Sequence, residues 1–332
     1  MTRVAGEETT ASRRRFLVTW LLLVGLTIAA FAGTVAILNS TLYSASGFVS
    51  SYLNTLARHD VSAALATPGV TRPESGADDL LVPAALGPLG DIRLESDTVS
   101  NDGDHLLEYS YTFTGKRELS QFAVARAGVH LGFFSSWRFR ASPMGLLTVT
   151  PQHAASFTAN GIMLSSSKPG APSAYRVLTP ASVVLGHSST YLAAKPTPVA
   201  VTHPASVAAE VDIQANNAFV KELQNQLDAQ LTQCTTQKVL LPTGCPFGQH
   251  MDNRIEGEPV WSMASYPKLA IVPGPATGQW QVPQTPGAAH LKVQVRSLFD
   301  GTLSTFDEDV PFTISYSIIF SGSGVPTITA RQ

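Results

Sequence analysis

Residues 16–38 read FLVTWLLLVGLTIAAFAGTVAIL, a stretch that contains no charged side chain. At about 1.5 Å per residue, a helix over this stretch covers the ~30 Å hydrocarbon layer of a bilayer. Arg13, Arg14 and Arg15 come directly before it, and the next basic residue is Arg58. Because basic flanks remain on the cytoplasmic side, we predict a single-pass cell-membrane protein. Residues 1–15 form its cytoplasmic tail, residues 16–38 span the membrane, and the rest lies outside the cytoplasm.

A cleaved signal peptide is the alternative interpretation of this segment. Ala30, Phe31 and Ala32 form an A-x-A-like cleavage site after an apolar stretch. However, the apolar run exceeds the ~7–15 residues of a signal peptide's apolar region. It also continues beyond the possible cut, so the sequence favours a retained anchor.

Small residues recur every four positions along the predicted membrane helix, at Gly25, Ala29 and Gly33. Residues spaced by four share one helix face, and small side chains there allow a second helix to approach closely. The pattern predicts that two copies of the chain associate through this face. Ala and Gly are also common in membrane helices that do not associate, so both interpretations stay open.

The composition limits the kinds of partner that the outer portion binds. Charged residues make up 14% of the 332 residues, against a usual ~25% in soluble proteins, and the formal net charge is -2. Nucleic-acid binding requires a basic surface that this balance does not provide. The length allows two or three compact units.

Residues 39–145 show helical periodicity first and strand alternation afterwards. Apolar residues at three- and four-residue intervals predict a helix that ends near residue 60, a short helix at 61–66 follows, and a Pro/Gly-rich connection runs over 68–88. Alternation then predicts strands at 92–99 and 107–113 joined by a turn at 101–104, with further strands at 119–124 and 129–139. Helices followed by an antiparallel sheet indicate an α+β domain. The helical positions are Leu42, Val49, Tyr52, Leu53 and Leu56.

This order of elements resembles membrane-anchored extracytoplasmic proteins of actinobacteria that carry a nuclear-transport-factor-like (cystatin-like) domain. The likeness covers roughly residues 46–143 and depends on FVSSYLNTLARHDVSAALA (48–66) and WRFRASP (137–143). The resemblance implies a cystatin-like fold for residues 39–145. Members of that fold include enzymes that use its cone-like cavity, ligand binders and scaffolds, so the resemblance implies a fold and not one function.

The remaining chain is expected to form two further parts. Short apolar alternations with many Ser and Pro predict a small β-rich unit at 146–205. A helix is expected to resume around Ala208, with an apolar stripe at Phe219, Leu223, Leu227 and Leu231. Two alternating stretches at 291–296 and 312–320 then predict strands, so residues 206–332 read as a second α+β domain.

Cys234 and Cys245 are the only cysteines in the chain. Outside the cytoplasm, two thiols this close in sequence are expected to form a disulfide, which would tie the end of the Phe219 helix to the turn at 242–244. A metal or redox site with His250 is the alternative. It lacks both a C-x-x-C pair and a second pair of ligands at metal spacing.

No catalytic or cofactor motif is complete in this sequence. Residues 186–190 (GHSST) have Thr where a nucleophile elbow needs its second Gly, and Ser165 with Lys168 lacks the partner motifs of an S-x-x-K site. The acidic residues between 300 and 309 are expected on a solvated hairpin loop, because their spacing does not fit a calcium loop. The histidines show no metal-binding spacing either: His59, His105, His130, His153, His187, His203, His250 and His290.

The sequence therefore favours a non-catalytic cell-envelope protein that binds a protein partner or an envelope ligand, without a cofactor or metal. The alternative is an extracytoplasmic hydrolase or isomerase that uses the cystatin-like cavity. In that cavity, acid/base pairs such as Asp or His that converge on one pocket would favour the enzyme. A cavity filled with Leu and Phe would favour a scaffold.

Overall fold

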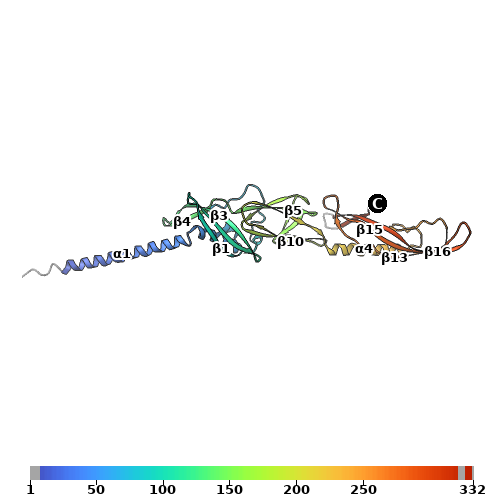
Figure 1. Cartoon of the computed structure of the whole chain (residues 1–332), viewed down its shortest axis with the longest axis horizontal. Helices are drawn as coiled ribbons and strands as arrows, with labels where there is room; N and C mark the ends of the chain where they lie inside the picture. Colours follow the sequence, from blue (N-terminus) through green and yellow to red (C-terminus); the bar gives the residue numbers. More distant parts are fainter. Residues whose placement is uncertain (1–7, 321–325, 331–332) are drawn as a thin grey trace, which may run out of the picture. The chain divides into compact units, whose positions relative to one another are not determined.

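The computed structural model describes residues 8–320 and 326–330, and Figure 1 shows the order of the elements. The architecture is α+β: an apolar N-terminal helix precedes mostly antiparallel sheets and a few further helices, which confirms the predicted α+β class. Residues 1–7 of the predicted tail lie outside the described part. The chain forms two compact units. Unit 1 comprises Met1–Leu147, Ala174–Val183 and Ala200–Val207, and unit 2 comprises Thr148–Ser173, Val184–Val199 and Ala208–Gln332.

Helix α1 (Glu8–Ser40) contains the predicted membrane segment. Its portion Arg14–Ser40 is long and apolar enough to cross a bilayer, with a mean hydropathy of 2.5, although a signal sequence meets the same criteria. Side chains on every side of the helix are exposed, including Leu21, Leu22 and Leu26. A helix that is apolar all round is suited to lipid. Figure 1 shows α1 as a single long rod.

Two capped helices follow α1 in unit 1. The Ser44 side chain accepts a hydrogen bond from the Gly47 N–H at the start of α2 (Ala45–Ala57), and Asp60 caps α3 (Val61–Leu65) in the same way. Such caps satisfy N–H groups that the first helical turn leaves without partners. Leu42, which we predicted on the helix, precedes its cap and is exposed.

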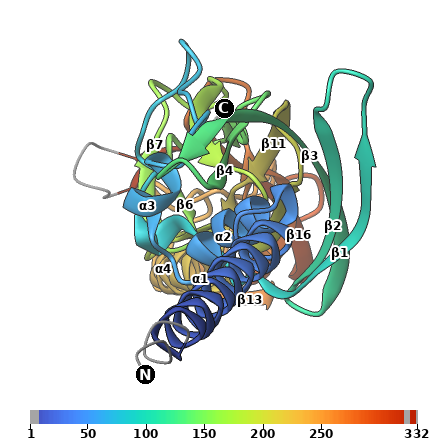
Figure 2. The ribbon, with the colours of Figure 1, turned by 90° about the vertical axis from the view of Figure 1, so that its left-hand side faces the viewer.

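Unit 1 continues with an antiparallel sheet in the order β1-β2-β3-β4. Figure 2 shows α2 beside this sheet, with β1 at its edge. The strands are β1 (Gly90–Val99), β2 (His105–Phe113), β3 (Lys116–His130) and β4 (Phe134–Phe139). The strands predicted at 92–99 and 107–113 are confirmed. The prediction of one strand over 129–139 is wrong, because the chain turns back at Leu131 and Gly132, which have positive φ of 52° and 80°.

Large side chains fill the space between α2 and the sheet. Tyr52 and Leu53 from α2 cluster with Leu107, Phe122 and Phe139 from the strands, and each is at most 5% exposed. The Tyr52 hydroxyl oxygen lies 2.9 Å from the carbonyl oxygen of Thr179 and 3.2 Å from that of Pro143, and its one proton is shared between these two acceptors. Burial raises the pKa of Tyr52 well above its usual value. This interior is apolar, and its two buried tyrosines, Tyr52 and Tyr109, direct their hydroxyl groups to polar partners.

Residues 144–215 form short strands in two sheets, and several strands contribute residues to both units. One sheet has the order β11-β5-β8 and the other β12-β10-β9-β6-β7. The strands are β5 (Met144–Gln152), β6 (Ser156–Ala159), β7 (Ile162–Ser165), β8 (Ser173–Leu178), β9 (Ala181–Ser188), β10 (Leu192–Val201), β11 (Ser206–Asp212) and β12 (Gln214–Ala215). The β character predicted for this segment is confirmed.

The end of the chain combines one helix with a sheet in the order β13-β15-β16-β17, to which β14 pairs through β15. Helix α4 (Asn217–Thr235) buries the predicted stripe from Phe219 to Leu231. It does not begin around Ala208, which lies in β11. Asn216 caps it by accepting from the Phe219 N–H (2.9 Å). The strands are β13 (Arg254–Ser265), β14 (Val272–Pro273), β15 (Gln279–Arg296), β16 (Leu303–Phe320) and β17 (Pro326–Ala330).

Candidate functional site

A pocket of about 600 Å³ lies within unit 2 and is the best candidate for a functional site. Its volume falls within the ~300–1,000 Å³ typical of small-molecule sites. It is lined by His153, Ala154, Ala155, Ser156, Ser165, Pro169, His187, Ser189, Thr190, Tyr191, Leu192, Gly278 and Phe320. No Asp, Glu, Lys or Arg is among these residues. The polar lining therefore consists of hydroxyl groups, imidazoles and backbone.

His187 is the most constrained polar side chain of this pocket. It lies on β9 and is 8% exposed. Its Nδ1 is 2.9 Å from the carbonyl oxygen of Ser156 on β6, and its Nε2 is 3.2 Å from Ser189 Oγ. Because a carbonyl only accepts, Nδ1 must carry the proton, and in the neutral ring Nε2 accepts a hydrogen bond. The ring is therefore held in one tautomer and orientation.

Ser189 belongs to the tight turn between β9 and β10. Its hydroxyl donates to the carbonyl oxygen of Leu192 (3.1 Å) and accepts from the Leu192 N–H (3.1 Å). A serine hydroxyl has a single proton. The proton therefore serves either Leu192 or His187 at any moment, and the turn competes with the imidazole for it.

A second histidine and an aromatic wall complete the pocket. His153 Nδ1 is 3.1 Å from the carbonyl oxygen of Ile213, and its ring lies 5.8 Å from that of Trp280. Tyr191 lies 5.0 Å from Phe219 and 6.1 Å from Phe320, centroid to centroid. Of these rings, Tyr191 and Phe320 line the pocket and form its aromatic wall, which offers flat apolar surface. The imidazoles and hydroxyls offer hydrogen bonds. This combination suits a neutral ligand that has both hydroxyl groups and an apolar face.

Sequence spacing did not predict this pocket. His153 and His187 lie on segments that the strand pairing of unit 2 brings together, and neither has a partner at a recognisable interval. Gly186 and Ser188 of the rejected elbow lie on β9, so the backbone there continues as a strand. Ser165 lines the pocket, whereas Lys168 accepts a hydrogen bond from Ser166 Oγ through its backbone carbonyl (2.7 Å).

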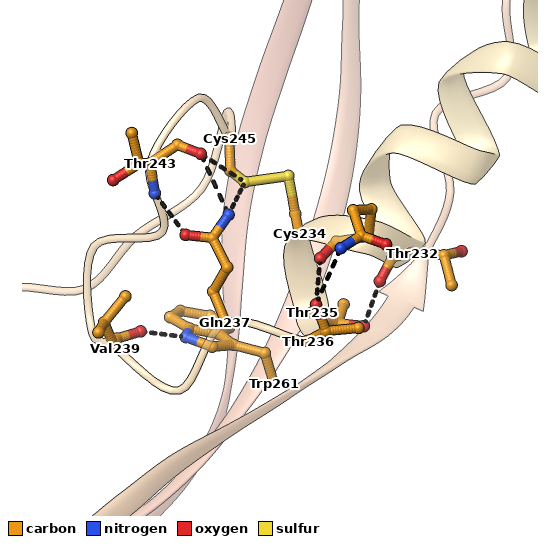
Figure 3. The surroundings of a disulfide bond; sticks show 10 residues. Thr232, Cys234, Thr235, Thr236, Gln237, Val239, Thr243, Cys245 and Trp261 are labelled. Carbon is orange, nitrogen blue, oxygen red and sulfur yellow. Dashed lines mark hydrogen bonds between the residues drawn. A yellow bond between two sulfur atoms is a disulfide. The ribbon is translucent and has the colours of Figure 1, made fainter.

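The structure joins Cys234 and Cys245 in a disulfide, as the sequence predicts (Figure 3). Cys234 lies in the last turn of α4, and Cys245 follows the turn at 242–244. Sulfur atoms in a disulfide are not thiolate ligands. The alternative of a metal site with His250 therefore fails in this structure. Among the described residues, no three His, Cys, Asp or Glu side chains are placed to hold a metal ion.

The side chain of Gln237 holds the loop that the disulfide closes. Its Oε1 accepts from the Thr243 N–H (2.8 Å), and its Nε2 donates to the Thr243 carbonyl oxygen (3.1 Å), as Figure 3 shows. On the neighbouring strand, Trp261 Nε1 donates to the carbonyl oxygen of Val239 (2.7 Å). The loop is thus fixed by the disulfide, by two hydrogen bonds of the Gln237 amide and by one hydrogen bond from the Trp261 indole.

Gly25, Ala29 and Gly33 lie on the exposed surface of α1. A Cβ added at Gly25 or Gly33 would have no neighbour within 4 Å. Around these two glycines the small-residue face therefore has no such neighbour among the residues that the structure describes, and association through it stays a prediction.

The predicted acidic loop is wrong for most of its members. Asp300 lies in the turn between β15 and β16, but Asp307, Glu308 and Asp309 lie on β16, which pairs with β15. There the carboxylates of Asp309 and Asp307 are 2.8 Å and 2.7 Å from the two ring nitrogens of His290. The hydrogen bonds that these carboxylates accept raise the pKa of His290; the bond to Asp309 has the largest effect and the bond to Asp307 the next largest. The cluster is an exposed ion-pair network on the sheet.

No protein-family model, curated protein or solved structure matches this chain.

Proposed function

We propose that this protein is a non-catalytic, membrane-anchored protein of the cell envelope whose unit 2 pocket binds a neutral, hydroxyl-rich small molecule such as a short saccharide. The observation that carries the proposal is the pocket itself. It has a ligand-sized volume, a lining without Asp, Glu, Lys or Arg, fixed imidazoles and an aromatic wall. Charged ligands would lose their hydration there and would meet no Asp, Glu, Lys or Arg in the lining; the Asp212 carboxylate, 3.6 Å from His153 Nδ1, is not part of that lining.

Three features support an extracytoplasmic location. Helix α1 has the length and composition of a membrane span, and Arg13, Arg14 and Arg15 precede it on one side only. The positive-inside rule then leaves the chain after residue 38, and with it all of unit 2, outside the cytoplasm. The disulfide between Cys234 and Cys245 agrees, since structural disulfides persist in oxidising compartments.

The filled interior of unit 1 supports a scaffold role for that unit. We propose a cystatin-like fold for residues 39–145, with two helices lying against a four-stranded antiparallel sheet. In this unit the space between α2 and the sheet is occupied by Tyr, Leu and Phe side chains. Among the described buried residues of the whole chain, His187 in unit 2 is the one His, Asp, Glu, Lys or Arg. The interior between α2 and the sheet therefore holds none of these charged or imidazole groups among its described buried residues, whereas Asp91, Arg93 and Arg117 line a separate pocket of about 230 Å³ in unit 1.

Saturation-transfer NMR on the full-length protein in detergent tests the proposal directly. We expect signals from neutral glucose, mannose or N-acetylglucosamine oligomers, and none from sugar phosphates or uronates of the same size. The variant His153→Ala should weaken binding, whereas Tyr266→Ala, on a different exposed surface, should not. The proposal would be refuted if the folded wild-type protein binds none of the neutral sugars, or if the His153→Ala variant binds them as well as the wild type does.

The alternative is a serine hydrolase, favoured by the 3.2 Å contact between His187 Nε2 and Ser189 Oγ. In such an enzyme His187 takes the proton of Ser189 as general base, and the Ser156 carbonyl orients the ring. A fluorophosphonate probe distinguishes the two functions. Labelling that disappears in Ser189→Ala but persists in Ser188→Ala would establish the hydrolase. An unlabelled wild-type chain would exclude it.

A further inference from the structure

The hairpin formed by β3 and β4 extends beyond the rest of its sheet and ends in apolar residues. Strand β3 pairs with β2 only as far as Val124, opposite His105, whereas its pairing with β4 continues to His130. The overhang of residues 125–130, which pairs with β4 but not with β2, is roughly 20 Å long at ~3.3 Å per residue. At its end, Leu131 is 71% exposed and Phe133 is 55% exposed. Exposed apolar residues gathered at a protruding tip mark a contact site.

This tip lies against the outer end of α1. The rings of Phe133 and Phe31 meet edge to face with centroids 5.4 Å apart. One step further out, Tyr43 stacks on Phe134 with centroids 4.4 Å apart. The tip and the membrane helix therefore form one continuous apolar surface.

The position of Phe31 along α1 sets the depth of the tip. If the hydrocarbon layer ends at Leu38, Phe31 lies about 10 Å inside it at ~1.5 Å per residue. If a ~30 Å layer instead begins at Phe16, Phe31 lies about 8 Å below the outer boundary. Even if the whole 5.4 Å separation of the rings points outward, Phe133 stays about 2 Å inside the hydrocarbon.

The polar backbone near the tip is satisfied by residues at the exit of α1. Asn39 Nδ2 donates to the carbonyl oxygen of Phe133 (2.8 Å), and Asn39 Oδ1 accepts from the Ser135 N–H (2.9 Å). Trp137 Nε1 donates to the carbonyl oxygen of Tyr43 (2.8 Å). Internal partners of this kind are what backbone requires at the edge of a bilayer, where water is scarce. Aromatic rings are likewise typical of that depth.

We propose that the β3–β4 tip is a second membrane contact, which inserts Leu131 and Phe133 among the lipid acyl chains of the outer leaflet beside α1. The inference depends on the proposed function in one respect, that α1 spans the membrane. Two insertion points fix unit 1 at a set height and rotation above the bilayer, whereas a single helix leaves rotation about its axis free.

Depth-dependent fluorescence on the full-length protein in phosphatidylcholine vesicles tests this contact. Both native cysteines are in the disulfide, so a single added cysteine is the one free thiol. We attach an environment-sensitive fluorophore to Leu131→Cys and, as a matched control, to Leu119→Cys. Leu119 is a half-exposed leucine of β3, the strand that leads into the tip, and lies up to about 40 Å from the tip. The label at position 131 should shift to shorter wavelength and lose emission to nitroxide lipids, and the label at 119 should lose emission to aqueous iodide.

A third label at Thr27→Cys separates the inference from the proposed function. If the label at position 27 resists the nitroxide lipids, α1 does not span the bilayer and the proposed anchoring fails. If position 27 is quenched by lipid while position 131 is quenched by iodide, the anchor holds and the tip contact is wrong. If position 131 resists both quenchers, protein covers the tip, as in association with a second copy, and the lipid contact is also wrong.

Discussion

Removal of the disulfide by the paired change Cys234→Ala and Cys245→Ala is expected to destabilise unit 2 by about 3 kcal/mol. The bond joins residues with a sequence separation of 11. In the chain-entropy model, closing such a loop lowers the conformational entropy of the unfolded chain by about 9 cal/mol/K. At 25 °C this raises the free energy of the unfolded chain by ~3 kcal/mol. A midpoint shift of ~2–4 °C per kcal/mol predicts that unit 2 unfolds about 6–12 °C lower. Thermal unfolding followed by tryptophan emission measures this, since Trp261 contacts the loop.

Reductant provides the control for this change. Wild-type protein treated with a phosphine reductant should unfold at the temperature of the paired variant, and the same treatment should leave the variant unchanged. If the wild-type and variant proteins instead unfold within about 2 °C of each other, the loss is below ~1 kcal/mol. The contacts of Gln237 would then hold the loop without the covalent bond, and the entropic argument would be refuted.

Three further predictions concern single residues. Tyr52→Phe leaves a buried carbonyl without its donor and should cost about 1–3 kcal/mol in urea unfolding, whereas Tyr266→Phe, on an exposed contact, should cost less than ~0.5 kcal/mol. Gly69→Ala should destabilise more than Gly115→Ala in the same assay. Both have positive φ, a cost of about 1–2 kcal/mol for alanine, but of the two only Gly69 would place its Cβ against backbone, at the carbonyl oxygen of Phe139. The pKa of His290 is higher in the folded state than its value of about 6.5 in the unfolded state. The ion pairs of His290 therefore stabilise the fold fully below pH ~6.5, and this stabilisation is lost as pH rises through the folded pKa. Unfolding midpoints of wild type and His290→Gln should therefore differ at low pH and converge at high pH, and a constant difference would contradict the argument.

Local patterns in the sequence predicted the elements whose physics is local. The α4 stripe, the alternation in β2 and the 101–104 turn each depend on side chains within a few positions, and the structure contains all of them. The early start expected for α4 could have been corrected from the sequence. Asn216 is a strong N-cap residue directly before the amphipathic stretch.

The β3–β4 turn was missed for a physical reason. Turns are normally recognised by Gly, Pro, Asn, Asp and Ser, but this one is surrounded by Leu131, Phe133 and Phe134. Its single turn signal, Gly132, was read as part of a strand. Apolar residues at a turn carry a cost in water, and the same residues are favourable if the turn lies in lipid. The error and the inferred membrane contact therefore have one origin.

The pocket of unit 2 could not be predicted from spacing. His187 is positioned by Ser156 from another strand, and Tyr191 meets Phe320 across 129 positions of chain. Such contacts follow from strand pairing over long sequence separations, and a single sequence carries no periodic signal for them. The cysteines were different, because two thiols separated by 11 positions form a local pair.

The central claim about this protein is that unit 2 lies outside the cytoplasm. Phe299 is 99% exposed at the turn between β15 and β16, so a cysteine there is fully accessible to reagents. With Phe299→Cys in intact cells, a membrane-impermeant maleimide should label the full-length, membrane-bound chain before the cells are broken. Labelling that occurs only after lysis would place unit 2 in the cytoplasm and contradict the account, and labelling of a chain shortened by loss of residues 1–32 would show a cleaved signal in place of an anchor.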